Sequence, residues 1–370
     1  MNYLERYQIW CKTAPLCEGD LRKLKELSND ETEMKSCFGE ELQFGTGGIR
    51  GVMGLGTNRM NSFTVRRTAQ GLAAWLTGSG LPLRCAIGYD SRHNSRRFAE
   101  ICAVALAKAG ALAKAGVHVF VYRVLAPTPM VSFAVRQLGC GTGIVVSASH
   151  NASKYNGIKC YGPDGCQMTD EPASRVFQAI SKTPYFIQPK LTFEEAMQRG
   201  SVEYISDDLW ECYYRTVMAE RLTDEPAAGL RIVYTPLHGA GNVPVRTVLG
   251  RTGVEVSVVS VQEQPDGDFT TCEYPNPEME AAMQESYRLA PCRKATAWRS
   301  RSIPILSLAP TPTATAAPWP SRWTAASASC PAMSWAACCW IIFSARLPKR
   351  MPCRATPWPC AASFPPRWPT

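Results

Sequence analysis

Residues 143–162 read GIVVSASHNASKYNGIKCYG, and this stretch decides how the surrounding chain is expected to fold. Its first residues form an apolar run typical of a buried strand, and a second strand is expected after the turn formed by Tyr-Asn-Gly. The loop between the strands holds Ser149, His150 and Asn151, with Lys159 ten residues after Ser149. A connection that only had to turn would not require a hydroxyl, an imidazole and an amine so close together. The stretch therefore predicts a strand–loop–strand unit whose loop carries reactive side chains.

Strands and helices alternate on both sides of this stretch. Residues 1–40 have a helical pattern, and Ser62–Gly80 is helical by its apolar spacing. Leu83–Ala111 reads as strand, polar turn and helix, and Leu230–Val261 as strand, glycine-rich loop, helix and strand. A glycine-rich loop is expected around Arg50. Such alternation is typical of α/β domains with active loops at strand ends, and it predicts two units of related layout.

Charge is divided unevenly along the 370 residues. The net charge is +9, but Pro291–Thr370 holds ten Lys and Arg and no acidic residue, which leaves 30 basic and 31 acidic residues in positions 1–290. The last 80 residues also lack Gly, Val, Asn, Gln, Tyr and His, yet hold seven of the ten Trp. Disordered tails are poor in Trp, and nucleic-acid-binding arms cluster their basic residues, so neither class explains this composition.

A shift of reading frame near residues 288–292 would explain the tail. In a GC-rich gene, the third codon positions are mostly G or C. If a frame shift makes them second positions, the product is mostly Ala, Pro, Ser, Thr, Arg, Cys and Trp, and these residues dominate the last 80 positions. If each codon is moved back by one base, the codons of Thr311–Ala316 are compatible with Asp-Pro-Asp-Gly-Asp-Arg. Those of Pro331–Ala336 are then compatible with Ser-Gly-Asn-Glu-Met-Gly. The hypothesis is that residues 291–370 are out-of-frame translation; a genuine low-complexity tail is the alternative.

The N-terminus and the cysteines bear on the compartment. The first residues mix acidic and basic side chains, so no signal peptide is predicted. The longest apolar run, Trp335–Phe343, is too short to span a bilayer as a helix. Sixteen cysteines without paired metal spacing, in a chain of this length, indicate reduced thiols. We therefore expect a soluble, cytoplasmic protein.

Ser149 is the first candidate for a reactive group. A serine after a strand is most often a turn or cap hydroxyl, which is the simplest interpretation. A hydrolase would place its nucleophile in a G-x-S-x-G elbow, which this loop lacks. A serine that carries a phosphoryl group instead needs cations and backbone donors nearby. The neighbouring imidazole and amine favour this second chemistry.

The segment GTGGIRG, from Gly45 to Gly51, is a candidate phosphate contact. Backbone amides can approach a phosphate closely where glycines carry no side chain, and Arg50 offers a planar fork for the phosphate oxygens. A tight structural turn uses the same residues, so the glycines alone are weak evidence. The segment is not a Walker A loop, because the final G-K-[ST] is absent.

Two further polar groups have structural as well as functional interpretations. Asp90 and Arg92, in GYDSR, lie at the end of an expected strand, where a solvated charge pair or a structural brace is the more frequent role. His238, in TPLHGAG, is as readily a buried, hydrogen-bonded histidine as a functional one.

Five motifs occur in the order of a known family: FGTGGIRGVMG, GYDSR, VVSASHNASKYNGIK, TPLHGAG, and PDGDF followed by PNPE. Together they resemble the α-D-phosphohexomutase family, of the phosphoglucomutase and phosphomannomutase type, over roughly residues 40–280. The serine loop is the most specific of the five. Ser147 and Ala152 stand here for the Thr and Pro of the family's T-A-S-H-N-P pattern, which loosens the loop without removing its reactive groups.

The resemblance implies a fold. It predicts an α/β protein of two consecutive three-layer α/β/α domains with mixed sheets, followed by an aberrant, disordered tail. An N-terminal helical segment would cover residues 1–40, domain I with the phosphoserine loop residues 41–198, and domain II residues 199–290. The tail, residues 291–370, would replace domain III, and domain IV would be absent.

The resemblance also implies a reaction. A phosphohexomutase is an isomerase that moves a phosphate between C1 and C6 of a hexose through a bisphosphorylated intermediate. Ser149 would carry the phosphoryl group, Lys159 would assist proton transfer, and Arg50 would steady the phosphoryl group. The phosphate on Ser149 would be one ligand of a Mg²⁺ ion. The implied catalytic residues are Ser149, His150, Lys159 and Arg50, and the implied substrate- or phosphate-binding residues are Thr46, Gly47, Gly48 and Asn151.

The implied partners are glucose or mannose 1- and 6-phosphates and hexose 1,6-bisphosphate, with no nucleic acid and no membrane. The family's Asp-rich Mg²⁺ loop and its G-N-E sugar loop are missing from the chain as written, and the shifted frame would restore both in the tail. With Mg²⁺ held by phosphoserine alone, we expect weak metal binding and little activity. Two alternatives remain: a catalytically dead fragment that binds sugar phosphates, and a basic-tailed binder of nucleic acid or acidic surfaces.

Overall fold

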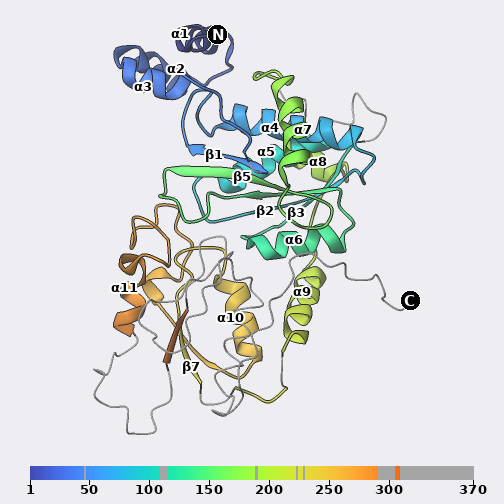
Figure 1. The fold of residues 1–370 in the computed structure, drawn as a ribbon, viewed down its shortest axis with the longest axis vertical. Helices are drawn as coiled ribbons and strands as arrows, with labels where there is room; N and C mark the ends of the chain where they lie inside the picture. The colour runs from blue at the N-terminus through green and yellow to red at the C-terminus, as the bar shows by residue number, and fades with distance from the viewer. Residues whose placement is uncertain are drawn as a thin grey trace.

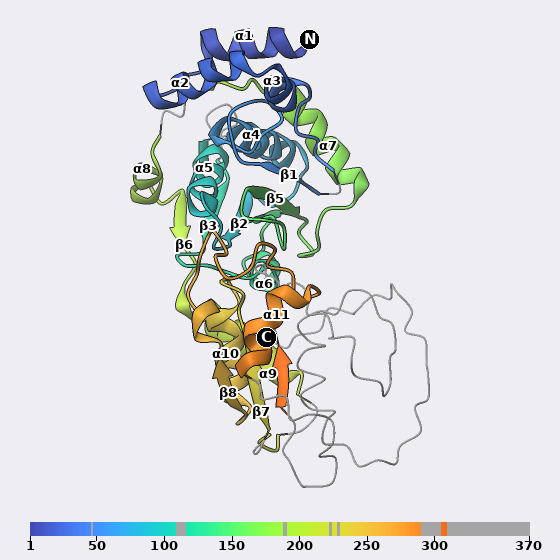
Figure 2. The ribbon, with the colours of Figure 1, turned by 90° about the vertical axis from the view of Figure 1, so that its left-hand side faces the viewer.

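The computed structural model of the chain describes residues 1–45, 47–108, 116–187, 191–221, 224–227, 230–289 and 305–308. Figure 1 shows the N-terminal helices at one end, a first α/β domain in the middle and a second α/β domain at the other end. The view turned by 90° shows the same succession (Figure 2). The frame-shift hypothesis and the segments 311–316 and 331–336 on which it depends lie outside the described residues.

The N-terminal segment is helical, as predicted. Its elements are α1 (Tyr3–Thr13), α2 (Glu18–Glu26), the 3-10 turn η1 (Leu27–Asn29) and α3 (Glu31–Phe38). Asn2 and Glu5 form a capping box that begins α1. Trp10 packs edge-on against Phe38 and Phe63, with ring centroids 5.7 and 5.3 Å away. These aromatic contacts attach the helices to the first domain, because Phe63 belongs to that domain.

The first domain is built on a mixed sheet of six strands. They are β1 (Gly48–Val52), β2 (Arg84–Tyr89), β3 (His118–Val121), β4 (Thr142–Val146), β5 (Tyr155–Tyr161) and β6 (Val202–Tyr204). Their order across the sheet is β1-β5-β4-β2-β3-β6. The strands β4, β2, β3 and β6 are parallel, whereas β5 runs antiparallel to both of its neighbours, β4 and β1. The carboxyl ends of β2 and β4 therefore lie side by side at one edge.

Helices cover both faces of this sheet, which confirms the predicted three layers. They are α4 (Ser62–Gly78), α5 (Ser95–Lys108), α6 (Thr128–Gln137), α7 (Asp170–Ser181), α8 (Phe193–Gln198) and α9 (Asp207–Ala219). Ile144 and Val146 of β4 belong to the core cluster beneath α4, α5 and α7, whereas Val145 belongs to the cluster with α6 and α9. Figure 1 shows α6 across the sheet from α4, α5 and α7.

The second domain contains a parallel sheet in the order β8-β7-β9. Its elements are β7 (Arg231–Tyr234), α10 (Asn242–Arg251), β8 (Glu255–Val258), η3 (Ser260–Gln262), α11 (Glu280–Leu289) and β9 (Ile305–Leu308). Ile232 and Tyr234 pack against Val245 and Leu249 of α10 in one buried cluster. The predicted succession of strand, loop, helix and strand is confirmed here.

The helix α9 packs between the two domains. Tyr213 of α9 lies edge-on against Phe133 of α6, with ring centroids 5.4 Å apart. The same buried cluster contains Tyr214 of α9 and Val248 of α10. One apolar cluster therefore includes side chains from both domains.

Four local expectations are corrected by the structure. Arg50 lies in strand β1 rather than in a loop, and Tyr-Asn-Gly at 155–157 begins β5 rather than forming a turn, because all five residues of β1 pair with residues 155–159 of β5. The strand β6 pairs with β3 in the first sheet, whereas the predicted boundary after residue 198 assigned it to the second domain. Within the segment predicted to be disordered, Ile305–Leu308 form β9 against β7, so that their backbone groups are paired.

The cysteines and the helices of the structure bear on the predicted compartment. All ten cysteines in the described parts of the chain carry free thiols, as expected for reduced cysteines. No helix in those parts combines the length and the apolar character needed to cross a bilayer. The apolar run 335–343 lies outside the described residues.

Candidate active site

The serine loop, residues 147–153, follows β4 at its carboxyl end. Ser149 has a φ of +56°, in the left-handed region that residues other than glycine rarely adopt. Its N–H donates to Ser147 Oγ at 2.9 Å, and its own Oγ lies 3.4 Å from His150 Nδ1. Ser149 is 9% exposed, so little of this residue is open to water. An uncommon backbone conformation at an enclosed serine favours a functional loop over a simple turn.

Arg92, in the loop after β2, holds the backbone of the serine loop. Its Nη atoms donate to four backbone carbonyls: Ser149 at 2.9 Å, Ala152 at 2.8 Å, Tyr155 at 3.1 Å, and Asn151. The Arg92 side chain is fully buried, so water does not compete for these bonds. The predicted structural brace is confirmed, and the alternative of a solvated charge pair is wrong.

Asp90 holds Arg92 in turn. Its Oδ2 forms an ion pair with Arg92 Nε at 3.3 Å, and its Oδ1 accepts from the Arg92 N–H at 3.0 Å and from the Ser95 hydroxyl at 2.7 Å. Burial lowers the pKa of Arg92, and the Asp90 carboxylate opposes that shift. A buried ion pair persists only where its remaining groups are hydrogen-bonded, as Asp90 Oδ1 and the Nη atoms of Arg92 are here.

The sequence reasoning missed Asn156, which completes this network. Asn156 is fully buried in β5, and its Nδ2 donates to Ser95 Oγ and to the His93 carbonyl, both at 3.0 Å. The sequence did contain a signal for Asn156. Side chains alternate between the two faces of a strand, and this alternation after the serine loop puts one polar side chain on the inward, otherwise apolar face of the strand.

Arg50 and Lys159 reach the serine loop from the antiparallel pair β1 and β5. Arg50 lies opposite Gly157 and Lys159 opposite Gly48, so the two cations share one face of the sheet. The exposed Arg50 donates from Nη1 to Asn151 Oδ1 at 3.3 Å. Lys159 is half-buried and lies within the electrostatic reach of Asp90, Arg50 and Arg92.

The pKa values of two site residues are shifted by this surrounding. Burial lowers the pKa of Lys159, Arg50 and Arg92 lower it further, and Asp90 opposes them. Burial and then Arg50 lower the pKa of His150, while Glu278 of the second domain opposes that shift. Both shifts favour the neutral side chains, because charging either one adds a cation to a cationic surrounding.

Two glycines of the segment 45–51, Gly47 and Gly48, lie close against neighbouring backbone. A Cβ on Gly48 would lie 2.1 Å from the Ile158 carbonyl oxygen, and one on Gly47, where φ is +69°, would lie 2.8 Å from the Met168 carbonyl oxygen. The Gly47 carbonyl accepts from the N–H of Cys160. These contacts explain why both positions are glycine, and the predicted phosphate-binding role of Gly47 and Gly48 stays a prediction. Thr46, the remaining predicted phosphate contact, lies outside the described residues.

The second domain reaches this site through the turn 266–272. His93 Nε2 lies 2.8 Å from Asp268 Oδ1, and the ring centroid of Phe269 lies 4.9 Å from the guanidinium carbon of Arg92. A Cβ on Gly267 would meet the His93 nitrogen at 3.0 Å, which shows how closely the two domains approach here.

His238 proves to be a buried, hydrogen-bonded histidine. It is 4% exposed, with Nδ1 2.8 Å from the Gln264 carbonyl oxygen and Nε2 2.9 Å from Thr271 Oγ1. Both ring nitrogens are occupied, so the structural interpretation of His238 is the correct one.

The side chains around Ser149 do not fit a Mg²⁺ ion. Mg²⁺ requires several oxygen ligands, commonly carboxylates. Asp90 is engaged with Arg92 and Ser95, Arg50 and Lys159 are cations, and Glu278 of the second domain adds one carboxylate near His150. Within the described ranges, no three His, Cys, Asp or Glu side chains gather in a way that could hold a metal ion. A phosphate on Ser149 would meet cations here.

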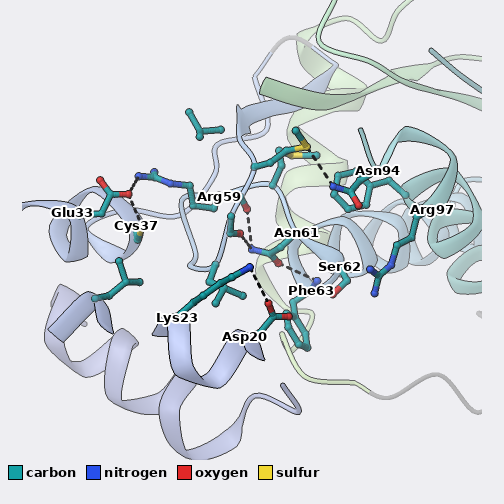
Figure 3. A pocket seen from close by; sticks show the side chains of 17 residues that line it. Asp20, Lys23, Glu33, Cys37, Arg59, Asn61, Ser62, Phe63, Asn94 and Arg97 are labelled. Carbon is teal, nitrogen blue, oxygen red and sulfur yellow. Dashed lines mark hydrogen bonds and ion pairs between the residues drawn. The ribbon is translucent and has the colours of Figure 1, made fainter. Parts of the chain in front are cut away.

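A separate cavity of about 360 Å³ lies between the N-terminal helices and the first turns of α4 and α5 (Figure 3). Arg59, which is 8% exposed, forms its wall and donates to Glu33 Oε1 at 3.1 Å and Ser36 Oγ at 2.6 Å. Lys23 and Arg97 also line it. None of the predicted site residues lines this cavity, so it is distinct from the serine loop.

Known family models match much of the described chain. Residues 41–185 match the model described as phosphoglucomutase/phosphomannomutase, alpha/beta/alpha domain I. Residues 211–297 match the model described as domain II of the same family.

Curated relatives and solved structures agree with these matches. A phosphoglucomutase of Staphylococcus epidermidis is 34% identical over 72% of this chain and 48% of its own length, and one of Staphylococcus aureus is 33% identical over 70% and 46%. The chain thus spans about half the length of the curated relatives it matches.

A crystal structure assigned as a phosphomannomutase from Thermus thermophilus superposes with a TM-score of 0.60 at 22% identity, over 74% of this chain and 56% of that one. A phosphoglucomutase/phosphomannomutase family protein from Burkholderia thailandensis superposes with a TM-score of 0.52 at 20% identity, over 66% and 49%. At these identities the superpositions show the shared fold.

Proposed function

Because the chain belongs to the phosphoglucomutase/phosphomannomutase family, we propose that Ser149 carries the phosphoryl group of a phosphohexomutase reaction. The substrates in this proposal are the 1- and 6-phosphates of glucose or mannose, and hexose 1,6-bisphosphate is the intermediate. Since the chain spans about half of its relatives' length, the proposal concerns the part of the reaction that occurs at the serine.

The observation that carries the proposal is the surrounding of Ser149 Oγ. Ser149 is largely buried, and its loop is held by four hydrogen bonds from one buried guanidinium. Arg50 and Lys159 lie on the same face of the sheet beside the loop. A phosphoserine carries up to two negative charges, so cations held in place beforehand stabilise it and the charge that develops during its transfer.

Phosphoryl transfer at Ser149 balances with one proton transfer. A sugar hydroxyl oxygen forms a bond to phosphorus as the bond from phosphorus to Ser149 Oγ breaks. The proton of the sugar hydroxyl passes to the Lys159 amine, and the Ser149 oxygen leaves as a hydroxyl after it takes a proton from the resulting ammonium. The lowered pKa of Lys159 increases the fraction of free amine that can accept this proton. With a hexose monophosphate as the acceptor, the products are hexose 1,6-bisphosphate and free serine.

His150 and Asn151 have supporting roles in this proposal. His150 Nδ1 lies close to the serine oxygen, and the lowered pKa of its ring favours the neutral form. A neutral imidazole can donate or accept one hydrogen bond without adding charge. Asn151 fixes the position of Arg50 through its Oδ1.

Complete turnover of hexose phosphates by this chain is expected to be slow. The family resemblance implies Mg²⁺, but the residues described around Ser149 do not fit it, and the cations Arg50 and Lys159 remain to offset the phosphate charge. An enzyme-like rate of interconversion by the purified 370-residue chain would contradict this expectation.

The direct test is phosphorylation of Ser149. The purified chain is incubated with hexose 1,6-bisphosphate, and peptide mass spectrometry locates any phosphate. We expect modification at Ser149, none in Ser149→Ala, and unchanged modification in Ser153→Ala, a control in the same loop. Phosphate absent from Ser149, or equally present on Ser153, would refute the role of the serine.

A sugar-phosphate-binding fragment is the second candidate function, favoured by a mainly cationic surrounding in which no cluster of three metal-binding side chains forms among the described residues. It predicts that glucose 6-phosphate binds, as measured by calorimetry, while Ser149 stays unmodified. The alternative that a basic tail binds nucleic acid falls on residues outside those described.

A further inference from the structure

The guanidinium of Arg92 has a protein partner facing every one of its donors. Arginine has five N–H groups in a fixed planar fork. One Nη donates to the carbonyls of Ala152 and Tyr155, and the other to those of Ser149 and Asn151. The fifth group, on Nε, meets Asp90 Oδ2 at 3.3 Å in an ion pair without hydrogen-bond geometry. The serine loop is therefore wrapped around one side chain that comes from 57 residues earlier in the chain.

This arrangement determines the conformation of Ser149. The carbonyl of Ser149 points at Arg92 Nη2 while the residue holds its left-handed φ. A backbone in that region is maintained only where surrounding contacts over-determine it. The loop itself supplies few such contacts: the Ser149 N–H bonds to Ser147 Oγ, and the Asn151 N–H to the Ala148 carbonyl at 3.2 Å. Arg92 supplies four more, all to backbone carbonyls.

The face of the same guanidinium is covered by the second domain. Phe269 lies 4.9 Å from its central carbon, is 1% exposed, and itself has a φ of +52°. Phe269 is packed in a buried cluster with Leu237 and Met283 of the second domain, so its ring moves with that domain. A cation over an aromatic face is attracted to it, most strongly where water is excluded.

We infer that Arg92 is a positioning residue that shapes the serine loop and couples it to the second domain through Phe269. Displacement of Phe269 changes the packing of the guanidinium, and the four carbonyls bonded to it follow. The orientation of Ser149 Oγ then depends on how the second domain sits. The meaning of this coupling for catalysis rests on the proposed phosphoryl transfer at Ser149, but the coupling itself is a property of the unphosphorylated chain.

Hydrogen exchange of the full, unphosphorylated chain tests the inference. The reporters are the amides of Ser149, Asn151 and Tyr155, each of which donates to an acceptor within the loop. In Arg92→Lys the charge is kept, but an ammonium has three donors and no planar fork. We expect exchange at the three amides to accelerate about tenfold, as loss of buried hydrogen bonds implies, while the amides of β4 keep their protection.

Two further variants separate coupling from general damage. Phe269→Leu keeps an apolar side chain of similar size in the second domain but removes the aromatic face, and we expect faster exchange at the same loop amides. Arg84→Lys is the matched control, because Arg84 also lies over an aromatic ring, Phe120, at 4.9 Å, away from the serine loop. We expect no change at the loop amides in Arg84→Lys.

The outcomes are decisive in both directions. Unchanged loop exchange in Arg92→Lys or in Phe269→Leu overturns the inference, as does an equal effect of Arg84→Lys. If Arg92→Lys does not fold, Phe269→Leu alone decides. Faster loop exchange with no phosphate ever found on Ser149 would support the positioning role and refute the proposed function. Phosphate on Ser149 together with unchanged loop exchange would support the proposed function and refute the positioning role of Arg92.

Discussion

Gly157→Ala is expected to destabilise the first domain and disturb the serine loop, although the change adds only one methyl group. Gly157 lies in β5 opposite Arg50, and its carbonyl accepts the N–H of Ser147 at the start of the serine loop. An added Cβ would lie 2.7 Å from the Ile49 carbonyl oxygen and 2.9 Å from the Ser147 carbonyl oxygen. Both neighbours are backbone atoms held by hydrogen bonds, Ile49 in strand β1 and Ser147 through its N–H to Gly157, so neither can rotate away.

The expected magnitude follows from two opposing effects. Overpacking a close-packed interior by a methyl group costs about 1 to 3 kcal/mol. Replacing glycine by alanine also restricts the unfolded chain, which contributes about 0.4 to 1 kcal/mol in the other direction. The midpoints of these ranges, about 2 and about 0.7 kcal/mol, give an expected net loss of about 1.3 kcal/mol in the free energy of unfolding.

Urea denaturation followed by far-ultraviolet circular dichroism measures this difference, with Gly78→Ala as the matched control. Gly78 is exposed at the end of α4, and an added Cβ there meets nothing within 4 Å. The control should be as stable as the parent or more stable by up to ~1 kcal/mol. If Gly157→Ala unfolds within 0.5 kcal/mol of the parent, on the order of the error of such measurements, the close approach of the three strands is not as described. We also expect Gly157→Ala to lower phosphorylation of Ser149, because the Ser147 carbonyl must move.

Two further predictions concern cationic side chains, the buried Arg59 and the half-buried Lys159. Arg59→Met removes the hydrogen bonds from the first domain to Glu33 and Ser36 of α3. We expect the free energy of unfolding to fall by about 2 to 3 kcal/mol and a protease to release the N-terminal helices earlier. An unchanged cleavage pattern would show that the aromatic contacts are enough to hold these helices in place. Lys159→Met should raise the melting temperature at neutral pH, because burial lowers the pKa of Lys159 and the charged amine opposes folding there. Below its folded pKa the lysine is charged in both states, so its penalty is present at neutral pH and is relieved as the pH rises from the folded pKa towards the ordinary value for lysine. The stability gap between Lys159→Met and the parent should therefore narrow in alkaline solution, and a gap independent of pH would contradict the assigned cause.

Local patterns predicted much of the fold. The apolar run before Ser149, the helical spacing of residues 62–78 and the succession of elements after residue 230 depend on residues near one another in sequence. Hydrophobic period and turn residues are sufficient signals for such elements. They failed at β1, where glycines suggested a loop and only pairing with β5 makes a strand, and at β6, whose place depends on the distant strand β3.

The amino-acid sequence by itself determined which reactive groups the serine loop carries, because Ser149, His150 and Lys159 are close along the chain. The tertiary structure alone decided what surrounds them. The strand order places β2 beside β4, which brings Arg92 to the loop, and the approach of the second domain adds Phe269 and Asp268. These contacts join residues up to 177 positions apart, as Arg92 and Phe269 are. No local pattern encodes such contacts, because they depend on how the sheet is ordered and how the two domains pack.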